Sequence, residues 1–269
     1  MFLGEQPAGA GRLQVLLERK VSMEALIPRP RNMVVDYSRH HPISPEAARA
    51  LRSYRFGQSL PAGVVHRKVL PPPGQECFDW HRIVVAPDSI TIECGDERAL
   101  FVAVQTIKAL LAAGSQTGLA CLTIEDWADF EWRIAMLDIS RDRVPTTETL
   151  LALIDLLCSL KYNQLQLYME HTYAYRGHEE VWKDASAITE DELRMIDAYC
   201  AERGIELVPN QNSFGHMERW LKFETYRHLG EMPDGFIDPW GVFRAVSTTL
   251  APVDHRSLEL IDDLYSQLL

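Results

Sequence analysis

Charged, imidazole and amide side chains follow three short apolar segments in the second half of the chain. Arg141 comes after Ile134–Ile139, Glu170 and His171 come after Gln164–Met169, and Asn210, Gln211, Asn212 and His216 come after Ile205–Pro209. A carboxylate and an imidazole can serve together as general acid and base. Arginine and amide side chains donate hydrogen bonds to neighbouring oxygens. These residue types point to acid–base chemistry on a hydroxyl-rich ligand.

The elements that would position these residues alternate between strand and helix. Ile134–Ile139 is a nearly continuous apolar run, which indicates a strand buried on both faces. Gln164–Met169 and Ile205–Pro209 are expected to be the next two strands. The helices between them are expected to start near Pro145 and at a capping box formed by Thr189 and Glu192, and a further helix is expected over Ser257–Leu269. Such alternation predicts βαβ units and a parallel sheet, whose carboxyl ends carry the loops that form active sites.

The first half of the chain has a different pattern. Residues 1–25 are expected to be a tail, and residues 26–126 an α+β domain. Ser44 is the expected N-cap of a helix that begins at Pro45. His81–Val85 and Ser89–Glu93 are expected to pair as strands, and Glu97–Leu111 carries apolar residues at helical spacing. The fold class is therefore α/β, with an α+β domain preceding a parallel βα region over residues 127–269.

Chain length limits what that region can be. A complete (β/α)₈ barrel takes about 250 residues, whereas roughly 140 residues follow Asp126 and supply about three strands. Either the region is a small open α/β domain or it is the front of a longer barrel, cut before its fourth strand. A three-stranded parallel sheet alone has two edge strands with unpaired backbone groups. We therefore expect a broad, weakly cooperative thermal unfolding transition or association of chains through those edges.

Composition excludes some partners and compartments. The net charge of −11 opposes binding to nucleic acid and to anionic membranes, and no stretch has the length of apolar sequence that spans a bilayer. The cysteines Cys77, Cys94, Cys121, Cys158 and Cys200 are odd in number and show no CxxC spacing. Together with the lack of a signal-peptide pattern, this favours a reducing, cytoplasmic location.

No cofactor or metal is expected. His171, His178, Glu179 and Glu180 lie close in sequence, but their spacing fits no standard metal template. Trp182, Trp220 and Trp240 are able to stack on a sugar ring, although core packing is the more frequent role for a tryptophan.

Three ordered segments resemble glycoside hydrolase family 20, the β-N-acetylhexosaminidases. Phe130–Arg141 resembles the first barrel strand of that family, and Lys161–Tyr168 resembles the second. Gly204–Pro209, followed by Phe214–Glu218, resembles the third strand and its Gly-His loop, with the hexosaminidase D-like branch the most similar in detail. Leu26–Pro28 and Phe101–Leu111 resemble parts of the domain that precedes this barrel.

The resemblance implies substrate-assisted hydrolysis of a terminal N-acetylhexosamine, in which the 2-acetamido oxygen of the sugar attacks the anomeric carbon. It implies that Arg141 binds sugar hydroxyls and that His216 supports the general acid through a carboxylate, for which Glu170 is the candidate. His171, Asn210 and Asn212 are candidate substrate contacts. The family's catalytic Asp-Glu pair ends the fourth strand, so the resemblance implies that this chain lacks the pair and is inactive alone.

Other interpretations remain open for each residue. Arg141 could form a salt bridge with Asp138 or Asp142, Glu170 could form a surface ion pair, and the amides could cap their own loop. At the level of the whole chain, one alternative is a non-catalytic carbohydrate-binding or interaction protein. Another is an unrelated small α/β enzyme that uses Glu170 and His216 as acid and base. The expected partner is a small molecule or oligosaccharide containing N-acetylhexosamine, and the sequence does not predict the oligomeric state.

Overall fold

The computed structural model describes residues 26–73, 77–113, 118–141 and 143–269, so the expected N-terminal tail lies outside the described residues. The chain forms two compact units. The first contains the residues up to Arg133 together with 156–161 and 202–204, and the second contains 134–155, 162–201 and 205–269.

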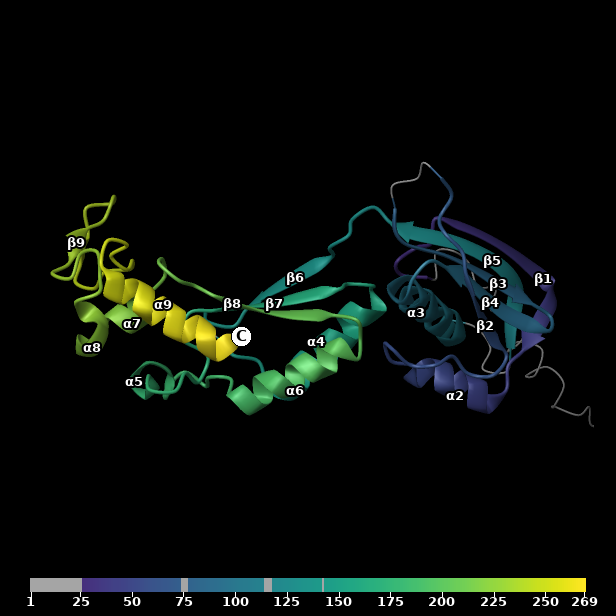
Figure 1. Cartoon of the computed structure of the whole chain (residues 1–269), viewed down its shortest axis with the longest axis horizontal. Helices are drawn as coiled ribbons and strands as arrows, with labels where there is room; N and C mark the ends of the chain where they lie inside the picture. The colour runs from purple at the N-terminus through teal and green to yellow at the C-terminus, as the bar shows by residue number, and fades with distance from the viewer. Residues whose placement is uncertain (1–25, 74–76, 114–117, 142) are drawn as a thin grey trace, which may run out of the picture. The chain divides into compact units, whose positions relative to one another are not determined.

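The first unit is built on a five-stranded sheet with the strand order β1-β5-β3-β4-β2 (Figure 1). The strands are β1 (Asn32–Pro42), β2 (Val64–Lys68), β3 (Phe78–Ala86), β4 (Ser89–Cys94) and β5 (Gly118–Ala128). All neighbouring pairs are antiparallel except β2 and β4, which are parallel. The sheet confirms the predicted pairing of the segments at 81–85 and 89–93.

Two helices complete this unit. In α2 (Pro45–Ser53), the Ser44 hydroxyl accepts a hydrogen bond from Ala47 N at 3.1 Å, which confirms the predicted N-cap. The longer α3 (Glu97–Ala113) packs on β3 and β4 through a continuous apolar face. Ile83, Ile92 and Ile107 are fully buried at this contact layer, so the core of the unit lies between α3 and the sheet.

The second unit contains a parallel sheet in the order β6-β7-β8. The strands are β6 (Ile134–Asp138), β7 (Gln164–Met169) and β8 (Glu206–Gln211), and the main helices are α4 (Thr147–Ser159), α6 (Glu190–Ala201) and α9 (His255–Leu268). The predicted capping box is present at α6, since Thr189 N donates to the Glu192 carboxylate at 2.9 Å and Glu192 N donates to the Thr189 hydroxyl at 3.3 Å. This is the front part of a (β/α)₈ barrel, with its first three strands, as the sequence predicts.

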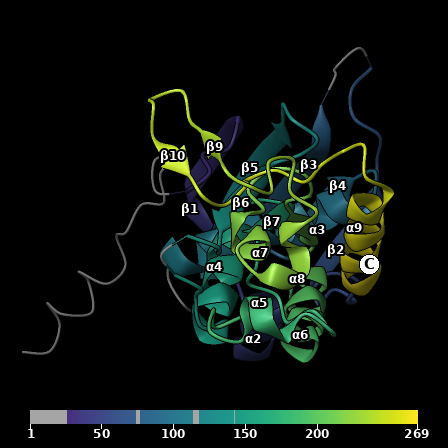
Figure 2. The same cartoon turned by 90° about the vertical axis from the view of Figure 1, so that its left-hand side faces the viewer.

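The connections that follow the strands carry shorter elements. These are α5 (Glu179–Trp182), α7 (Glu218–Leu221), α8 (Glu224–Arg227) and a small hairpin of β9 (Phe236–Ile237) and β10 (Phe243–Arg244). All of α7, α8 and the hairpin belong to the long connection between β8 and α9, and Figure 2 shows the hairpin to one side of the two short helices.

Two predictions about the strands are wrong in detail. The third strand does not end at Pro209, because Asn210 and Gln211 continue the register with Tyr168 and Met169 of β7. The first strand is not buried on both faces, since Ile134 is 44% and Met136 62% exposed. Leu165, Leu167 and Met169 are fully buried, so in the described residues the sheet packs on helices through one face only.

Candidate functional site

The parallel register of the second unit aligns polar residues across the ends of the three strands. Asp138, Tyr168 and Asn210 are directly paired neighbours on β6, β7 and β8. The loops that leave these strand ends carry Arg141, Glu170 and His216. Because parallel strands end at the same edge, residues separated by 75 positions in sequence meet in one cluster.

Three donors approach one oxygen of Glu170, whose side chain is only 6% exposed. The Tyr168 hydroxyl donates to Glu170 Oε1 at 2.9 Å, and Arg141 Nη2 lies 3.3 Å from the same atom. Nδ1 of His216 is 3.6 Å away, which is an ion-pair distance rather than a hydrogen bond. A buried carboxylate surrounded in this way is held in one position.

Arg141 forms the salt bridge with Asp138 that was considered for it and keeps part of its guanidinium exposed. Its guanidinium pairs with Asp138 through Nη1 at 2.7 Å and lies over the Tyr168 ring, with Cζ 5.3 Å from the ring centre. Asp138 raises the pKa of Arg141, so the cation is permanent. The side chain is nevertheless 54% exposed. The guanidinium is thus oriented by protein carboxylates while part of it faces solvent, where it can donate to ligand oxygens.

The backbone of Glu170 is fixed from both neighbouring strands. Glu170 N donates to the Ser140 hydroxyl at 2.6 Å, and Glu170 O accepts from Trp220 Nε1 at 2.6 Å and from Gln211 Nε2 at 3.1 Å. Tyr175 in turn donates to Gln211 Oε1 at 2.7 Å. Three buried side chains therefore hold the backbone of Glu170, and Tyr175 supports one of them.

His216 lies in a loop with unusual backbone geometry. Its φ of 54° is in the left-handed region, and its side chain is 62% exposed beside Glu170. Met217 N donates to Thr248 O at 2.9 Å and Leu250 N donates to Phe214 O at 2.8 Å, so both flanks of His216 are tied to a later segment. The loop therefore presents the imidazole toward solvent at a fixed place.

The other predicted contacts differ in their fit to this cluster. Asn212 donates to the Tyr168 hydroxyl and belongs to it. Asn210 lies within β8 and donates to Gln166 Oε1 at 3.1 Å. His171 lines a separate recess with Arg143 and Arg219. Its Nδ1 is buried without a partner, and burial, followed by Arg219 and Lys222, lowers its pKa to about 4.

Some functional residues were not predicted. Tyr168 links Arg141, Glu170 and Asn212, yet it sits inside an apolar strand and shows no motif of its own. Gln211 was grouped with the sugar-binding amides but holds the backbone of Glu170. Trp220 and Trp182 are internal hydrogen-bond donors, whereas Trp240 is 82% exposed. In the described residues, no group of three His, Cys, Asp or Glu side chains is arranged to hold a metal.

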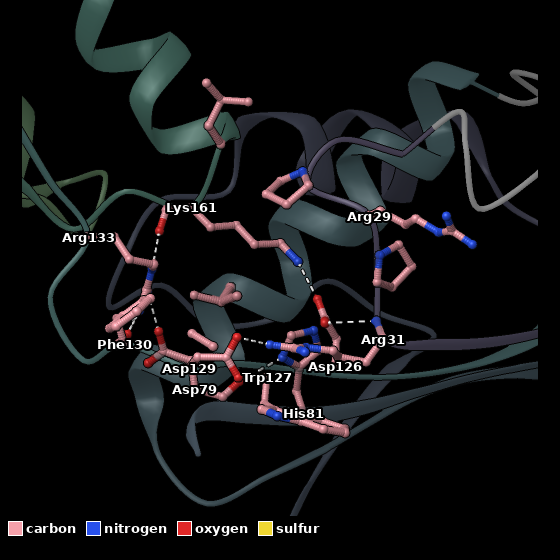
Figure 3. Close-up of a pocket in the computed structure, with 15 residues that line it drawn as sticks. Arg29, Arg31, Asp79, His81, Asp126, Trp127, Asp129, Phe130, Arg133 and Lys161 are labelled. Carbon is pink, nitrogen blue, oxygen red and sulfur yellow. Dashed lines mark hydrogen bonds and ion pairs between the residues drawn. The ribbon is translucent and has the colours of Figure 1, made fainter. Parts of the chain in front are cut away.

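A cavity of about 520 Å³ within the first unit provides a second concentration of charge (Figure 3). Asp79 pairs with Arg133 and with Arg98, and Lys161 Nζ donates to Asp126 at 2.8 Å. Figure 3 shows the Lys161 ammonium directed at Asp126. These carboxylates are at most 9% exposed and each meets its own cation. The network is largely satisfied by itself, so we assign the candidate functional site to the Glu170 cluster.

The parallel sheet, its helices and the cluster at the strand ends define a protein of the (β/α)-barrel class whose site is built by the loops after the strands. Residues 130–269 match the model of the glycosyl hydrolase family 20 catalytic domain, and residues 44–127 match that family's domain 2. The chain therefore belongs to glycosyl hydrolase family 20.

Individual relatives agree with this family. A β-hexosaminidase of Akkermansia muciniphila is 27% identical over 158 residues, which is 51% of this chain and 32% of the relative. Human hexosaminidase D is 27% identical over 140 residues, covering 52% of this chain and 26% of the relative. A mutant Streptomyces plicatus β-hexosaminidase in complex with its product GlcNAc superposes with a TM-score of 0.67 at 23% identity, over 92% of this chain and 57% of that one.

The chain spans about a quarter to a third of the length of these curated relatives. In the described residues, no helix combines the length and the apolar character needed to cross a membrane.

Proposed function

We propose that the second unit is the substrate-binding front of a β-N-acetylhexosaminidase barrel and that it binds a terminal N-acetylhexosamine. The observation that carries this proposal is the convergence of Arg141, Tyr168 and His216 on one oxygen of the buried Glu170. It is supported by the relatives, which are β-hexosaminidases, and by the GlcNAc product bound to one similar structure.

In this proposal Arg141 donates to sugar hydroxyls with the guanidinium edge that faces solvent. Glu170 keeps His216 oriented and supplies negative charge next to the reacting centre. The proton donor and the residue that orients the acetamido group belong, by the family resemblance, to a fourth strand. We therefore propose that this chain alone binds the sugar but does not hydrolyse its glycosides.

Two measurements test the proposal. Titration with N-acetylglucosamine, followed by nuclear magnetic resonance, should shift resonances of the loops that carry Arg141 and His216. A chromogenic N-acetylglucosaminide should show no turnover by this exact chain. Turnover that disappears in Glu170→Gln or His216→Gln would replace the proposal with a self-sufficient α/β enzyme that uses these residues as acid and base.

The alternative of a non-catalytic carbohydrate-binding protein rests on the same exposed guanidinium. The nucleotide sequence downstream of Leu269 separates the two, because a strand followed by Asp-Glu supports the hydrolase. Joining such a segment to this chain should restore turnover if the hydrolase proposal is right. Sugar binding without any restored turnover would favour the binding protein.

A further inference from the structure

The connection between β8 and α9 forms a recess of about 780 Å³ whose lining starts at Glu218, two residues after His216 in the chain. Its walls come from α7 and from the hairpin of β9 and β10, and they include Glu218 and Thr248. Thr248 O accepts the hydrogen bond from Met217 N, the residue after His216. The recess therefore begins within one or two residues of the proposed sugar site.

The hairpin presents aromatic side chains on a well-supported turn. The Asp238 carboxylate, 5% exposed, accepts hydrogen bonds from Trp240 N at 3.0 Å and Val242 N at 2.8 Å and pairs with Arg244 at 2.9 Å. Trp240 and Phe243 are nevertheless 82% and 62% exposed. Large aromatic rings held in solvent by a fixed turn are typical of a binding surface, because they present apolar area at small entropic cost.

The charges in this recess are not balanced in the way those of the first unit are. Arg244 and Asp238 form an ion pair. The remaining charged side chains of the lining are two cations, Arg219 and Lys222, and one anion, Glu218. In the described part of the chain, neither Arg219 nor Lys222 has a carboxylate within ion-pair distance, although Lys222 Nζ lies 4.7 Å from the Phe223 ring centre. A cationic recess is notable in a chain whose net charge is −11.

We propose that this recess binds an acidic sugar unit, carrying a carboxylate or a sulfate ester, that is linked to the N-acetylhexosamine. The inference rests on the proposed function, since it assigns the leaving-group side of the same substrate. The exposed rings of Trp240 and Phe243 cover the C–H face of a pyranose. Arg219 and Lys222 bind the anionic substituent through charge-assisted hydrogen bonds.

Calorimetric binding to the full chain tests this with matched ligands. The probes are N-acetylglucosamine, its β-linked disaccharide with a neutral sugar, the corresponding disaccharides with a uronic acid or a sulfated sugar, and a methyl uronide alone. We expect the acidic disaccharides to bind about tenfold more tightly than the neutral one at low salt, with a smaller ratio at high salt because the cations are exposed. The uronic acid and sulfate probes distinguish the two anionic groups.

Variants assign the preference to the recess. Arg219→Gln combined with Lys222→Gln should reduce the acidic disaccharides to the affinity of the neutral one. The control combines Lys183→Gln with Arg52→Gln, which also removes two exposed positive charges but none from the recess. It should keep the preference. Trp240→Ala should weaken all disaccharides several-fold, as expected from the loss of one stacking ring.

The outcomes separate this inference from the proposed function. Equal affinity for acidic and neutral disaccharides, or a preference that survives the double variant, overturns the acidic-sugar recess while leaving the N-acetylhexosamine site. Binding of the methyl uronide without any binding of N-acetylglucosamine supports the recess and overturns the proposed function. A wild-type dimer that Trp240→Ala converts to a monomer, with no change in sugar affinity, identifies the hairpin as a contact between copies and overturns the recess.

Discussion

The charged cavity of the first unit and the Glu170 cluster of the second contain the same residue types but combine them differently. In the cavity, Asp79 and Asp126 each have a close cationic partner, and both carboxylates are buried. In the cluster, three donors share one oxygen of Glu170, and the main cation, Arg141, is half exposed. Buried charge alone therefore does not mark a site. Hydrogen-bond donors that remain exposed to solvent, such as those of Arg141, indicate a ligand site.

The comparison predicts opposite consequences for removing a carboxylate charge. Asp79→Asn keeps the side-chain shape and suits the left-handed backbone at this position, where φ is 54°. It should still reduce the free energy of unfolding by about 3 kcal/mol, because two guanidiniums lose their shared anion in a buried setting. Urea unfolding followed by tryptophan fluorescence measures this loss.

Asp129→Asn is the matched control in the same cavity. Asp129 pairs with Arg31, but its side chain is 61% exposed, so the loss should stay under about 1 kcal/mol. Equal losses for the two variants would show that the paired network of the first unit contributes nothing beyond surface charge.

The pH dependence compares one buried histidine from each unit. Burial, and then the charge of Lys161, lowers the pKa of His81 to about 4, and burial lowers the pKa of His171 to about 4. Between about pH 6.5 and pH 4 the unfolded chain binds protons at these imidazoles and the folded chain does not. Stability should therefore be complete above pH 6.5 and decline as the pH falls toward 4.

His81 should contribute most of this decline, about 3 kcal/mol at most, because it is 1% exposed. The free energy of unfolding, measured at several pH values, should depend less on pH in His81→Gln than in the wild type. The difference from the wild type should be smaller for His171→Gln, because the imidazole of His171 is partly solvated. A larger effect from His171 would mean that the recess cations, not burial, dominate its proton affinity.

Glu170→Gln should change binding more than stability, the reverse of Asp79→Asn. The amide keeps the shape, but Arg141 and His216 lose the charge that orients them. We expect N-acetylglucosamine to bind about tenfold more weakly, while the free energy of unfolding changes by about 1 kcal/mol or less. Glu224→Gln, an exposed acid outside the cluster, should change neither quantity. A large loss of stability without a change in affinity would place Glu170 with the structural carboxylates.

Local sequence signals predicted the elements of the second unit better than its contacts. The capping box at Thr189 and the strand at Gln164–Met169 depend on neighbouring residues only, and both are present. The end of β8 was missed because Pro209 lacks an N–H group, yet a strand at the edge of a sheet tolerates proline. In the first unit, β1 was missed because its exposed polar sequence becomes a strand only through pairing with β5.

The site was predictable where a loop motif carried it and not where distant segments supply support. Arg141, Glu170 and His216 were chosen because they follow strands, and the structure brings the three side chains together. Trp220 reaches the carbonyl of Glu170 from 50 residues away, and no spacing rule indicates such a bond. His171 follows Glu170 directly, but adjacent residues at a strand end point in different directions, and His171 lines a separate recess with Arg143 and Arg219.

The smallest expected effect tests whether the cluster depends on one hydroxyl. Tyr168→Phe keeps the ring under the Arg141 guanidinium and removes the donor to Glu170 and the acceptor for Asn212. We expect stability to fall by about 1 kcal/mol and N-acetylglucosamine to bind about threefold more weakly, because Arg141 still approaches Glu170 directly. Tyr199→Phe removes a comparable bond to Asp155 at the surface and should leave sugar affinity unchanged. If Tyr168→Phe weakened sugar binding as much as Glu170→Gln does, the hydroxyl and not the shared carboxylate would be the organising group of the second region.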